Sequence, residues 1–367
     1  MNGSRPLRIA VDANLLDGAW GGIPKYLSRI ADELIAGGDE IHLLANTRHL
    51  ERPIAGAHEV GIRVKGRAVW RQAFLPLWLA RARPDVLWAP ESVLPRFSPC
   101  PTAVTIHDLA ALRFPGIKPP AHVRSFETEV ARSVRRATRT IAVSATTAAD
   151  VERYYGVGPE RVRVVHNGVD EAFTPGDREA ARAAVAARWG VEGPFVLHVG
   201  STEPRKGIDV LVEATALAAA EGTGWQLVLA GSSGFGSEPT EAAARASGAC
   251  HLLGPVSEGE LLDLMRGAGT FAAPALFEGF GIAPLEAMAC GTPAVIAGDS
   301  GGLEEISGPA AIVVAERSAA AWREGLEKAL TRPPELVERG LRHASRFRWP
   351  TVAAQVRDVL AETASRT

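Results

Sequence analysis

Short apolar runs alternate with amphipathic stretches along almost the whole chain. In the first half, strands are predicted at Leu7–Val11, Ile41–Ala45, Val86–Ala89, Ala103–Ile106, Thr140–Val143 and Val162–Val165. Between them, the spacing of apolar residues predicts helices such as Pro24–Ala36 and Phe126–Arg136. This alternation is typical of an α/β fold, in which a mostly parallel, doubly wound sheet carries helices on both faces.

The alternation begins again after residue 174. A charged, alanine-rich helix is predicted at Asp177–Trp189. Further strands are predicted at Phe195–Val199, Gln226–Ala230, His251–Leu253, Thr270–Ala273, Ala294–Ala297 and Ala311–Val314. The 367 residues are enough for two domains of ordinary size. We therefore expect two Rossmann-like domains, residues 1–174 and 175–349, followed by a last helix within residues 350–367.

Composition excludes several classes of protein. The 40 basic and 42 acidic residues give a net charge of −2, so no strong field favours nucleic acid, and any phosphate site must be local. Cys100, Cys250 and Cys290 are far apart and form no CxxC pair, which favours a reducing compartment without disulfides or structural zinc. With neither a secretory signal nor an apolar run of spanning length, we expect a cytoplasmic protein.

One amphipathic stretch, Trp70–Ala82, leaves two interpretations open. It places large apolar residues such as Phe74 and Trp78 beside Arg71 and Arg81. A helix that packs on its own core is the favoured interpretation. Peripheral contact with the inner face of a membrane through the apolar side is the alternative.

Two loops have the composition of anion-binding turns. Gly21, Gly22 and Ile23 precede Pro24 at the start of a predicted helix, where glycine allows close backbone approach and the free amides attract an anion. The segment Val199–Gly207 follows the first strand of the second domain and contains Ser201 and the adjacent Arg205 and Lys206. An arginine fork and a mobile ammonium at the carboxyl end of a strand suit a diphosphate.

The segment Pro274–Pro293 is the most informative. Glu278 is expected in a loop, followed by a turn at Gly279–Gly281, and Glu286 is expected in the first turn of a helix that begins near Pro284. Two carboxylates around such a turn can accept hydrogen bonds from sugar hydroxyls. His107 ends another predicted strand, where it could donate hydrogen bonds to a polar substrate or serve only the structure.

Taken together, these segments resemble glycosyltransferase family 4, whose retaining members have the GT-B fold. The likeness runs in order through the loop from Asp12 to Tyr26, the segment from Val165 to Asp170, and the basic turn Glu203–Lys206. It is most specific in the stretch EGFG…LEAMACGTP from Glu278 to Pro293. It implies two Rossmann-like domains that face a central cleft, with the last helix returning to the first domain.

The resemblance also implies roles for single residues. Arg205 and Lys206 would hold the diphosphate of a nucleotide sugar, with the amides of Gly21, Gly22 and Ile23 on the same phosphates. Glu286 would accept the ribose hydroxyls, and Val256 would meet the base. Glu278, together with Phe280, Gly281 and Ile282, would position the donor sugar, and His107 would contact it.

We therefore expect a bacterial hexosyltransferase that needs no cofactor and no metal, because the chain has no Asp-x-Asp pair and Arg205 and Lys206 stand in for one. The likeness is to the mannosyltransferase-like branch, which favours GDP-mannose modestly, with UDP- and dTDP-sugars open. The acceptor could be a glycan, a lipid-linked sugar or a secondary metabolite, and the oligomeric state stays open. A nucleotide-sugar epimerase and a silent donor-binding scaffold are the alternatives, while a dehydrogenase is disfavoured by the absence of GxGxxG after the first strand.

Overall fold

The computed structural model describes residues 5–17 and 21–366. Their contacts divide the chain into two compact units. Unit 1 comprises residues 1–113, 120–168 and 349–367, and unit 2 comprises residues 114–119 and 169–348. The short segment 114–119 thus groups with unit 2, although the predicted boundary near residue 174 would place it in the first domain.

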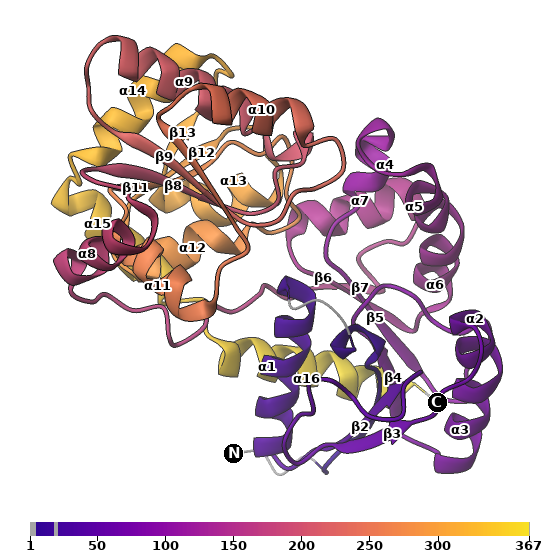
Figure 1. Ribbon diagram of the computed structural model, residues 1–367. Coiled ribbons are helices and arrows are strands. Elements are labelled where there is room, and N and C mark those ends of the chain that lie inside the picture. The colour runs from indigo at the N-terminus through magenta and orange to yellow at the C-terminus, as the bar shows by residue number, and fades with distance from the viewer. Residues whose placement is uncertain (1–4, 18–20, 367) are drawn as a thin grey trace. The chain divides into compact units, whose positions relative to one another are not determined.

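Unit 1 is built on a seven-stranded parallel sheet in the order β3-β2-β1-β4-β5-β6-β7 (Figure 1). Its strands are β1 (Arg8–Asp12), β2 (Glu40–Ala45), β3 (His58–Gly61), β4 (Val86–Ala89), β5 (Thr102–Ile106), β6 (Arg139–Ala142) and β7 (Val162–Val164). Most are fully buried, because helices cover both faces of a parallel sheet. Strand β3 was not predicted, since it lies at the edge and is largely exposed.

In the described part of unit 1, two pairs of neighbouring α-helices are joined through π-helices. The α-helices are α1 (Gly22–Ala36), α2 (Arg67–Val69), α3 (Leu75–Ala82), α4 (Ala110–Arg113), α5 (Pro120–Ser125), α6 (Ala131–Arg136), α7 (Ala145–Tyr155) and α16 (Trp349–Ala364). The π-helices η2 (Trp70–Phe74) and η4 (Phe126–Val130) interrupt α2–α3 and α5–α6. The predicted amphipathic helix is therefore three short segments, of which Trp70, Leu75 and Leu79 are buried in the core.

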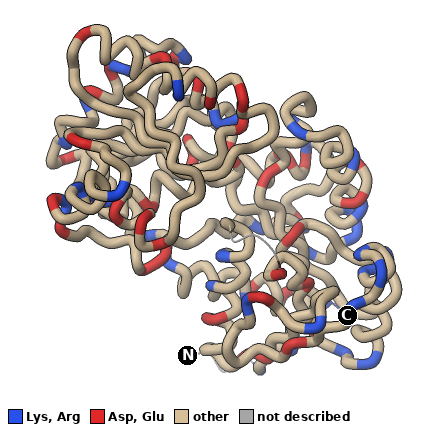
Figure 2. Tube along the Cα trace, viewed as in Figure 1, with Lys and Arg blue, Asp and Glu red and all other residues tan. Residues whose placement is uncertain are grey.

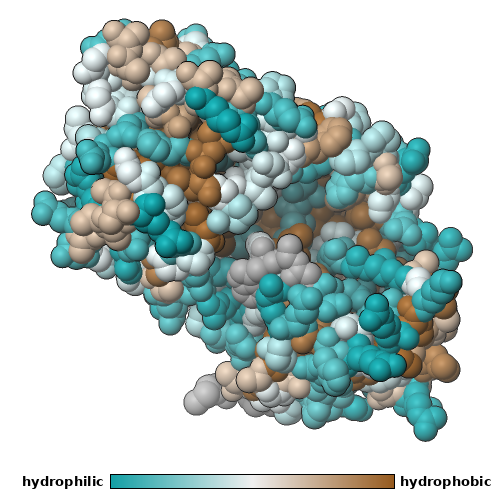
Figure 3. Space-filling model, viewed as in Figure 1, coloured by the Kyte–Doolittle hydropathy of each residue, from teal (hydrophilic) through white to brown (hydrophobic). Residues whose placement is uncertain are grey.

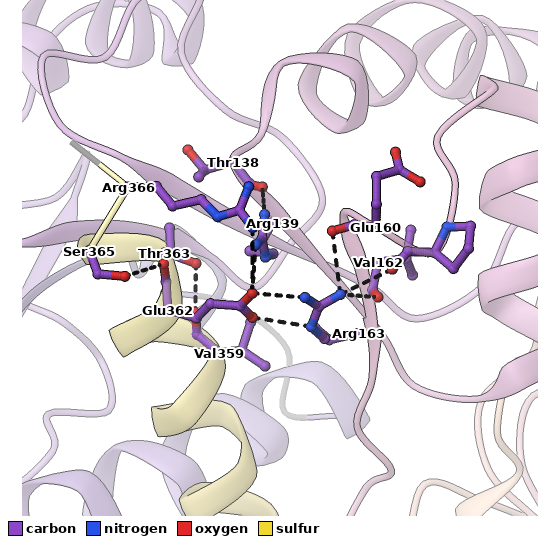
Figure 4. A network of polar contacts seen from close by, with 11 residues as sticks. Thr138, Arg139, Glu160, Val162, Arg163, Val359, Glu362, Thr363, Ser365 and Arg366 are labelled. Atoms are coloured by element: carbon purple, nitrogen blue, oxygen red, sulfur yellow. Dashed lines mark hydrogen bonds and ion pairs between the residues drawn. The ribbon is translucent and has the colours of Figure 1, made fainter.

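Helix α16 follows unit 2 in sequence but packs on unit 1. It contacts α1, β4, β5 and β6. Figure 4 shows how its end is held: Glu362 accepts hydrogen bonds from Arg139 at 2.5 Å and from Arg163 at 2.8 Å. These bonds keep the pKa of Glu362 at about 2. The side chain of Arg139 is only 1% exposed, so Glu362 supplies its counter-charge inside the unit.

Unit 2 has a six-stranded parallel sheet in the order β10-β9-β8-β11-β12-β13 (Figure 1). The strands are β8 (Phe195–Val199), β9 (Gln226–Ala230), β10 (Cys250–Gly254), β11 (Thr270–Ala273), β12 (Ala294–Ala297) and β13 (Ile312–Val314). The helices are α8 (Arg178–Trp189), α9 (Asp209–Ala220), α10 (Glu238–Ala246), α11 (Glu258–Gly267), α12 (Ile282–Ala289), α13 (Gly302–Ser307), α14 (Ala319–Leu330) and α15 (Pro334–Ala344). Both sheets confirm the doubly wound parallel architecture that the sequence predicted.

No helix in the described ranges combines the length and the apolar character that crossing a bilayer would require.

Candidate functional site

The turn after β8 is fixed to its neighbours by backbone bonds. The amide of Gly200 donates to Ala230 at the end of β9, at 2.9 Å, and the amide of Leu276 donates to the carbonyl of Arg205 at 2.8 Å. The turn ends at Gly207 in the left-handed region, with φ of +63°. A Cβ there would lie 2.3 Å from the carbonyl oxygen of Pro274, so only glycine fits.

Arg205, Lys206 and Glu278 form an ion triad at this turn. The guanidinium Nη1 of Arg205 lies 3.1 Å from Glu278 Oε2, and the ammonium of Lys206 donates to Glu278 Oε1. Arg205 also donates to the carbonyl of Phe277 at 2.6 Å and is only 7% exposed. The three residues come from two loops that are 72 positions apart, so the structure brings together what the sequence placed in separate motifs.

The charge of this triad is well defined. Burial alone would raise the pKa of Glu278, but Lys206 and Arg205 together outweigh it and hold that pKa at about 2. At neutral pH the carboxylate is therefore ionised, and the triad carries one net positive charge. A diphosphate is a natural competitor of Glu278 for these two cations.

Arg317 supports the loop that carries Glu278, and sequence reasoning did not find it. Its Nη1 donates to the carbonyl of Pro274 at 3.0 Å and its Nη2 to that of Ala275 at 2.9 Å. The residue follows β13 in a segment with no motif, so nothing in the sequence marks it. The fork holds the two carbonyls that precede Glu278 and thereby fixes the path of the loop.

His198 lies on β8 beneath the same turn and was also missed. Its Nδ1 is 2.9 Å from the carbonyl of Ala272, and burial lowers its pKa to about 4. The imidazole is therefore neutral, and with Nδ1 as the donor its Nε2 is an acceptor. A Cβ at Gly200 would lie 3.3 Å from that nitrogen and 3.6 Å from the Lys206 ammonium, so both groups approach the turn from within unit 2.

Helix α12 begins earlier than predicted. Gly281 caps it with φ of +79°, the helix starts at Ile282, and Pro284 is its third residue. Glu286 consequently lies in the second turn, not the first, and is buried. Phe280 is buried before the cap, while Gly281 and Ile282 are partly exposed. The prediction about the first turn was wrong because residues 282 and 283 already have helical conformation.

The other two predicted donor-binding residues of unit 2 lie at strand ends. Ser201 follows β8 and is partly exposed. Val256 follows β10 and is also partly exposed, just before Ser257, which caps α11 in a capping box with Glu260. Both stand at the carboxyl ends of parallel strands, where ligands of open α/β sheets bind.

In unit 1, Gly21, Gly22, Ile23 and Pro24 line a cavity of about 330 Å³ together with Leu15 and Glu91. Helix α1 begins there, with Gly21 as its N-cap, and no side chain of the described residues makes the cap hydrogen bond. Its first amides are thus available to an anion. Residues 18–20, part of the predicted glycine loop, lie outside the described residues. Glu91 was not predicted; it pairs with Arg67 at 2.6 Å.

His107, also in unit 1, follows β5 and uses one ring nitrogen inside its own unit. Its Nε2 lies 2.9 Å from the carbonyl of Pro90, and a carbonyl can only accept, so Nε2 carries the proton. Burial lowers the pKa of the imidazole, which favours the neutral form. Its Nδ1 is then an acceptor. His107 would therefore accept a hydrogen bond from a hydroxyl through Nδ1, whereas the sequence had led us to expect donation.

Within the described ranges, no group of three or more His, Cys, Asp or Glu side chains is arranged to hold a metal ion.

Two Rossmann-like units with parallel sheets, and a basic turn beside a carboxylate loop at the carboxyl ends of the central strands of the second, are the features expected of a glycosyltransferase of the GT-B type. Comparison with family models agrees. Residues 20–173 match Glycosyltransferase Family 4, and residues 182–344 match Glycosyl transferases group 1. The chain belongs to glycosyltransferase family 4.

Individual relatives support this assignment. The chain is 31% identical over 309 residues to a D-inositol 3-phosphate glycosyltransferase of Saccharomonospora viridis, covering 78% of this chain and 67% of that protein. It is 35% identical over 233 residues to the Gordonia bronchialis protein of the same name, covering 59% of this chain but only half of the relative. The structure of Anabaena HepE in complex with UDP and glucose matches with a TM-score of 0.77 at 18% identity, covering 97% and 100% of the two chains.

Proposed function

We propose that this chain transfers a hexose from a nucleoside diphosphate sugar to a hydroxyl of its acceptor, with retention of configuration and without a metal. The observation that carries the proposal is the ion triad of Arg205, Lys206 and Glu278 at the carboxyl ends of the central strands β8 and β11 of unit 2. Its two cations suit a diphosphate, and its carboxylate suits sugar hydroxyls. The difficult step is expulsion of the diphosphate, and fixed positive charge in a poorly solvated site assists it most.

The triad also supports an order of events. Without donor, Glu278 pairs with both Arg205 and Lys206 and offsets one of their two positive charges. When the donor arrives, its diphosphate takes over both cations, and Glu278 becomes free to accept hydrogen bonds from the sugar. The carboxylate thus acts as an exchangeable counter-ion that keeps two clustered cations stable in the empty enzyme. Gly21, Gly22 and Ile23 would offer amides to a phosphate, and His107 would accept from a sugar hydroxyl.

Retention is proposed to follow front-face substitution. The bond between the anomeric carbon and the phosphate oxygen breaks, the acceptor oxygen bonds to the same face of that carbon, and the acceptor proton passes to the departing phosphate oxygen. Double displacement would require a carboxylate nucleophile, and Glu278 is the obvious candidate. Its ion pairs to Arg205 and Lys206 favour a binding role instead. Trapping of a covalent sugar adduct on Glu278 would overturn this step.

The donor and the acceptor are proposed as classes. GDP-mannose and UDP- or dTDP-hexoses are the donor candidates, and the similar HepE was crystallised with UDP and glucose, which supports a uridine nucleotide. A glycan, a lipid-linked sugar or a secondary metabolite would supply the hydroxyl. The names of the sequence relatives add a phosphorylated cyclitol as a fourth acceptor candidate.

The test is thermal unfolding with a panel of nucleoside diphosphates in EDTA, followed by turnover with the best donor. A ligand at about 100 times its Kd should stabilise the protein by about 2.7 kcal/mol. The stabilisation should vanish in Arg205→Gln and persist in Arg188→Gln, a change of an exposed arginine in the same unit. Stabilisation without transfer to any acceptor would favour the scaffold, and donor epimerisation without acceptor would favour the epimerase. No stabilisation by any nucleotide would overturn the proposal.

A further inference from the structure

One side of the α2–η2–α3 stretch in unit 1 is apolar and exposed. Trp70, Leu75 and Leu79 face the core, whereas Val69 is 56% exposed and Leu77 is 71% exposed. These are unusually large fractions for side chains of this size, and packing on the unit's own core does not account for them. The π-helix η2 lies between the two residues, and its own buried residues are Trp70 and Arg71.

Phe97 extends the apolar face from a second segment. It is 63% exposed in the loop after β4. The preceding amide, of Arg96, donates to Oε1 of Gln72 at 2.7 Å, which holds this loop against η2. Two parts of the chain that are 20 or more positions apart thus lie together, and each has exposed bulky apolar side chains. We call Val69, Leu77 and Phe97 the apolar face.

The surroundings of the apolar face are strongly basic. Between Val60 and Pro84 the chain has six basic residues and no acidic one, although the whole protein has a net charge of −2. Five of the six are exposed: Arg63, Lys65, Arg67, Arg81 and Arg83. Figure 2 shows blue Lys and Arg segments on this side of unit 1, and Figure 3 shows brown atoms among teal ones there.

We propose that this face docks unit 1 on the surface of a membrane that contains anionic lipid. Exposed apolar side chains in a stretch of chain rich in exposed cations match the interface of such a bilayer, where the side chains enter the headgroup region and the cations meet lipid phosphates. An acidic protein partner would explain the charge but not three separate bulky apolar tips. Apart from Arg67, whose partner Glu91 lines the cavity at the start of α1, this surface shares no residue with the proposed donor site. Docking would bring the enzyme to an acceptor held in a membrane.

The test is sedimentation of the full chain with vesicles of phosphatidylcholine alone or with one third phosphatidylglycerol. Binding is expected only to the anionic vesicles and should weaken at high salt. The triple variant Arg63→Gln, Lys65→Gln, Arg83→Gln should bind about a hundredfold more weakly, since each basic residue near the surface contributes about fivefold. The variant Val69→Ser, Leu77→Ser, Phe97→Ser should lose binding at any salt concentration.

Matched controls lie in unit 2. Leu217→Ser with Val313→Ser removes exposed apolar side chains, and Arg339→Gln with Arg342→Gln removes exposed cations; both should bind vesicles like the unchanged protein. Equal loss in a control and a test variant would overturn the proposal, as would equal binding to both kinds of vesicle or to neither. If the serine variant changes the oligomeric state in gel filtration while vesicle binding is unaffected, the face is a contact between copies and the proposal fails.

Discussion

Replacement of Glu278 by Gln tests the ion triad directly, because it keeps the shape of the side chain and removes its charge. The pKa of Glu278 is about 2, against 4.5 for an ordinary glutamate, and the side chain is only 16% exposed. At 1.36 kcal/mol for each pKa unit, ionic contacts of Glu278 stabilise the fold by about 3 kcal/mol at neutral pH. Loss of one partner of a buried ion pair generally costs roughly 3–5 kcal/mol, which agrees with this value.

The direction in which this stabilisation changes with pH follows from the lowered pKa of Glu278. The stabilisation is complete above pH 4.5, where the unfolded carboxyl is also ionised, and it is lost as the pH falls toward 2. At pH 7, Glu278→Gln should therefore unfold in urea with a free energy about 3 kcal/mol below that of the unchanged protein. The amides of the turn 200–207 should exchange faster with deuterium, since this turn carries Arg205 and Lys206.

A nucleoside diphosphate distinguishes a ligand site from a structural ion cluster. If the diphosphate takes the place of Glu278 on the two cations, it should stabilise Glu278→Gln more than the unchanged protein while sugar transfer is lost. Glu221→Gln is the control, because it removes a carboxylate from an exposed pair with Arg323 and should cost less than about 1 kcal/mol. Equal unfolding free energies for the two variants, or equal stabilisation of variant and unchanged protein by the diphosphate, would refute the reasoning.

The remaining predictions concern the backbone at Gly207, the anchoring of α16, the protonation of His107 and the need for a metal ion. Gly207→Ala should destabilise unit 2 by roughly 3 kcal/mol or more in urea unfolding, because the added Cβ would meet the carbonyl of Pro274. Gly190 is also left-handed but has open space around it, so Gly190→Ala should cost only about 1 kcal/mol. Equal costs for the two variants would contradict the clash. Glu362→Gln should lower the free energy of unfolding of unit 1 by roughly 1–2 kcal/mol, less than for a fully buried pair because the Glu362 side chain is 35% exposed to solvent. It should also speed deuterium exchange in α16, because buried Arg139 loses its counter-charge. Transfer should fall on the acid side with a midpoint below the ordinary histidine pKa, where protonation of His107 abolishes its acceptor nitrogen, and His107→Gln should lose that limb. Activity should persist in EDTA, and dependence on added Mg²⁺ or Mn²⁺ would contradict metal independence.

The fold could be predicted because parallel strands that are buried on both faces appear in the sequence as continuous apolar runs. The edge strand β3 could not, since His58–Gly61 is exposed and has no such run. The residues of the triad were singled out, but the pairing of Glu278 with Arg205 and Lys206 depends on how two distant loops meet. Arg317 gave no signal, because an arginine that binds carbonyl oxygens looks like any surface arginine in a sequence.

The start of α12 shows a further limit. Pro284 fits the first position of a helix, and the sequence was interpreted accordingly. The structure begins the helix two residues earlier, because Gly281 takes the left-handed conformation that caps it. A shift of two residues moved Glu286 from the first turn to the second and changed which groups surround it. Helix ends are set by the geometry of neighbouring loops, which a single sequence does not contain.

Because α16 packs on unit 1, that unit cannot be completed until the last residues of the chain have been synthesised. Strand β7 ends at residue 164 and α16 begins at residue 349, so residues 165–348, 184 in number, lie between them. At 5–20 residues per second, a ribosome needs roughly ten to forty seconds for that interval. Throughout it, Arg139 lacks Glu362 and the surface under Val356 and Leu360 is uncovered. The first unit to emerge is therefore the last to be completed. A nascent chain stalled within unit 2 would expose the apolar surface that α16 covers in the finished protein, and chaperones bind such surfaces.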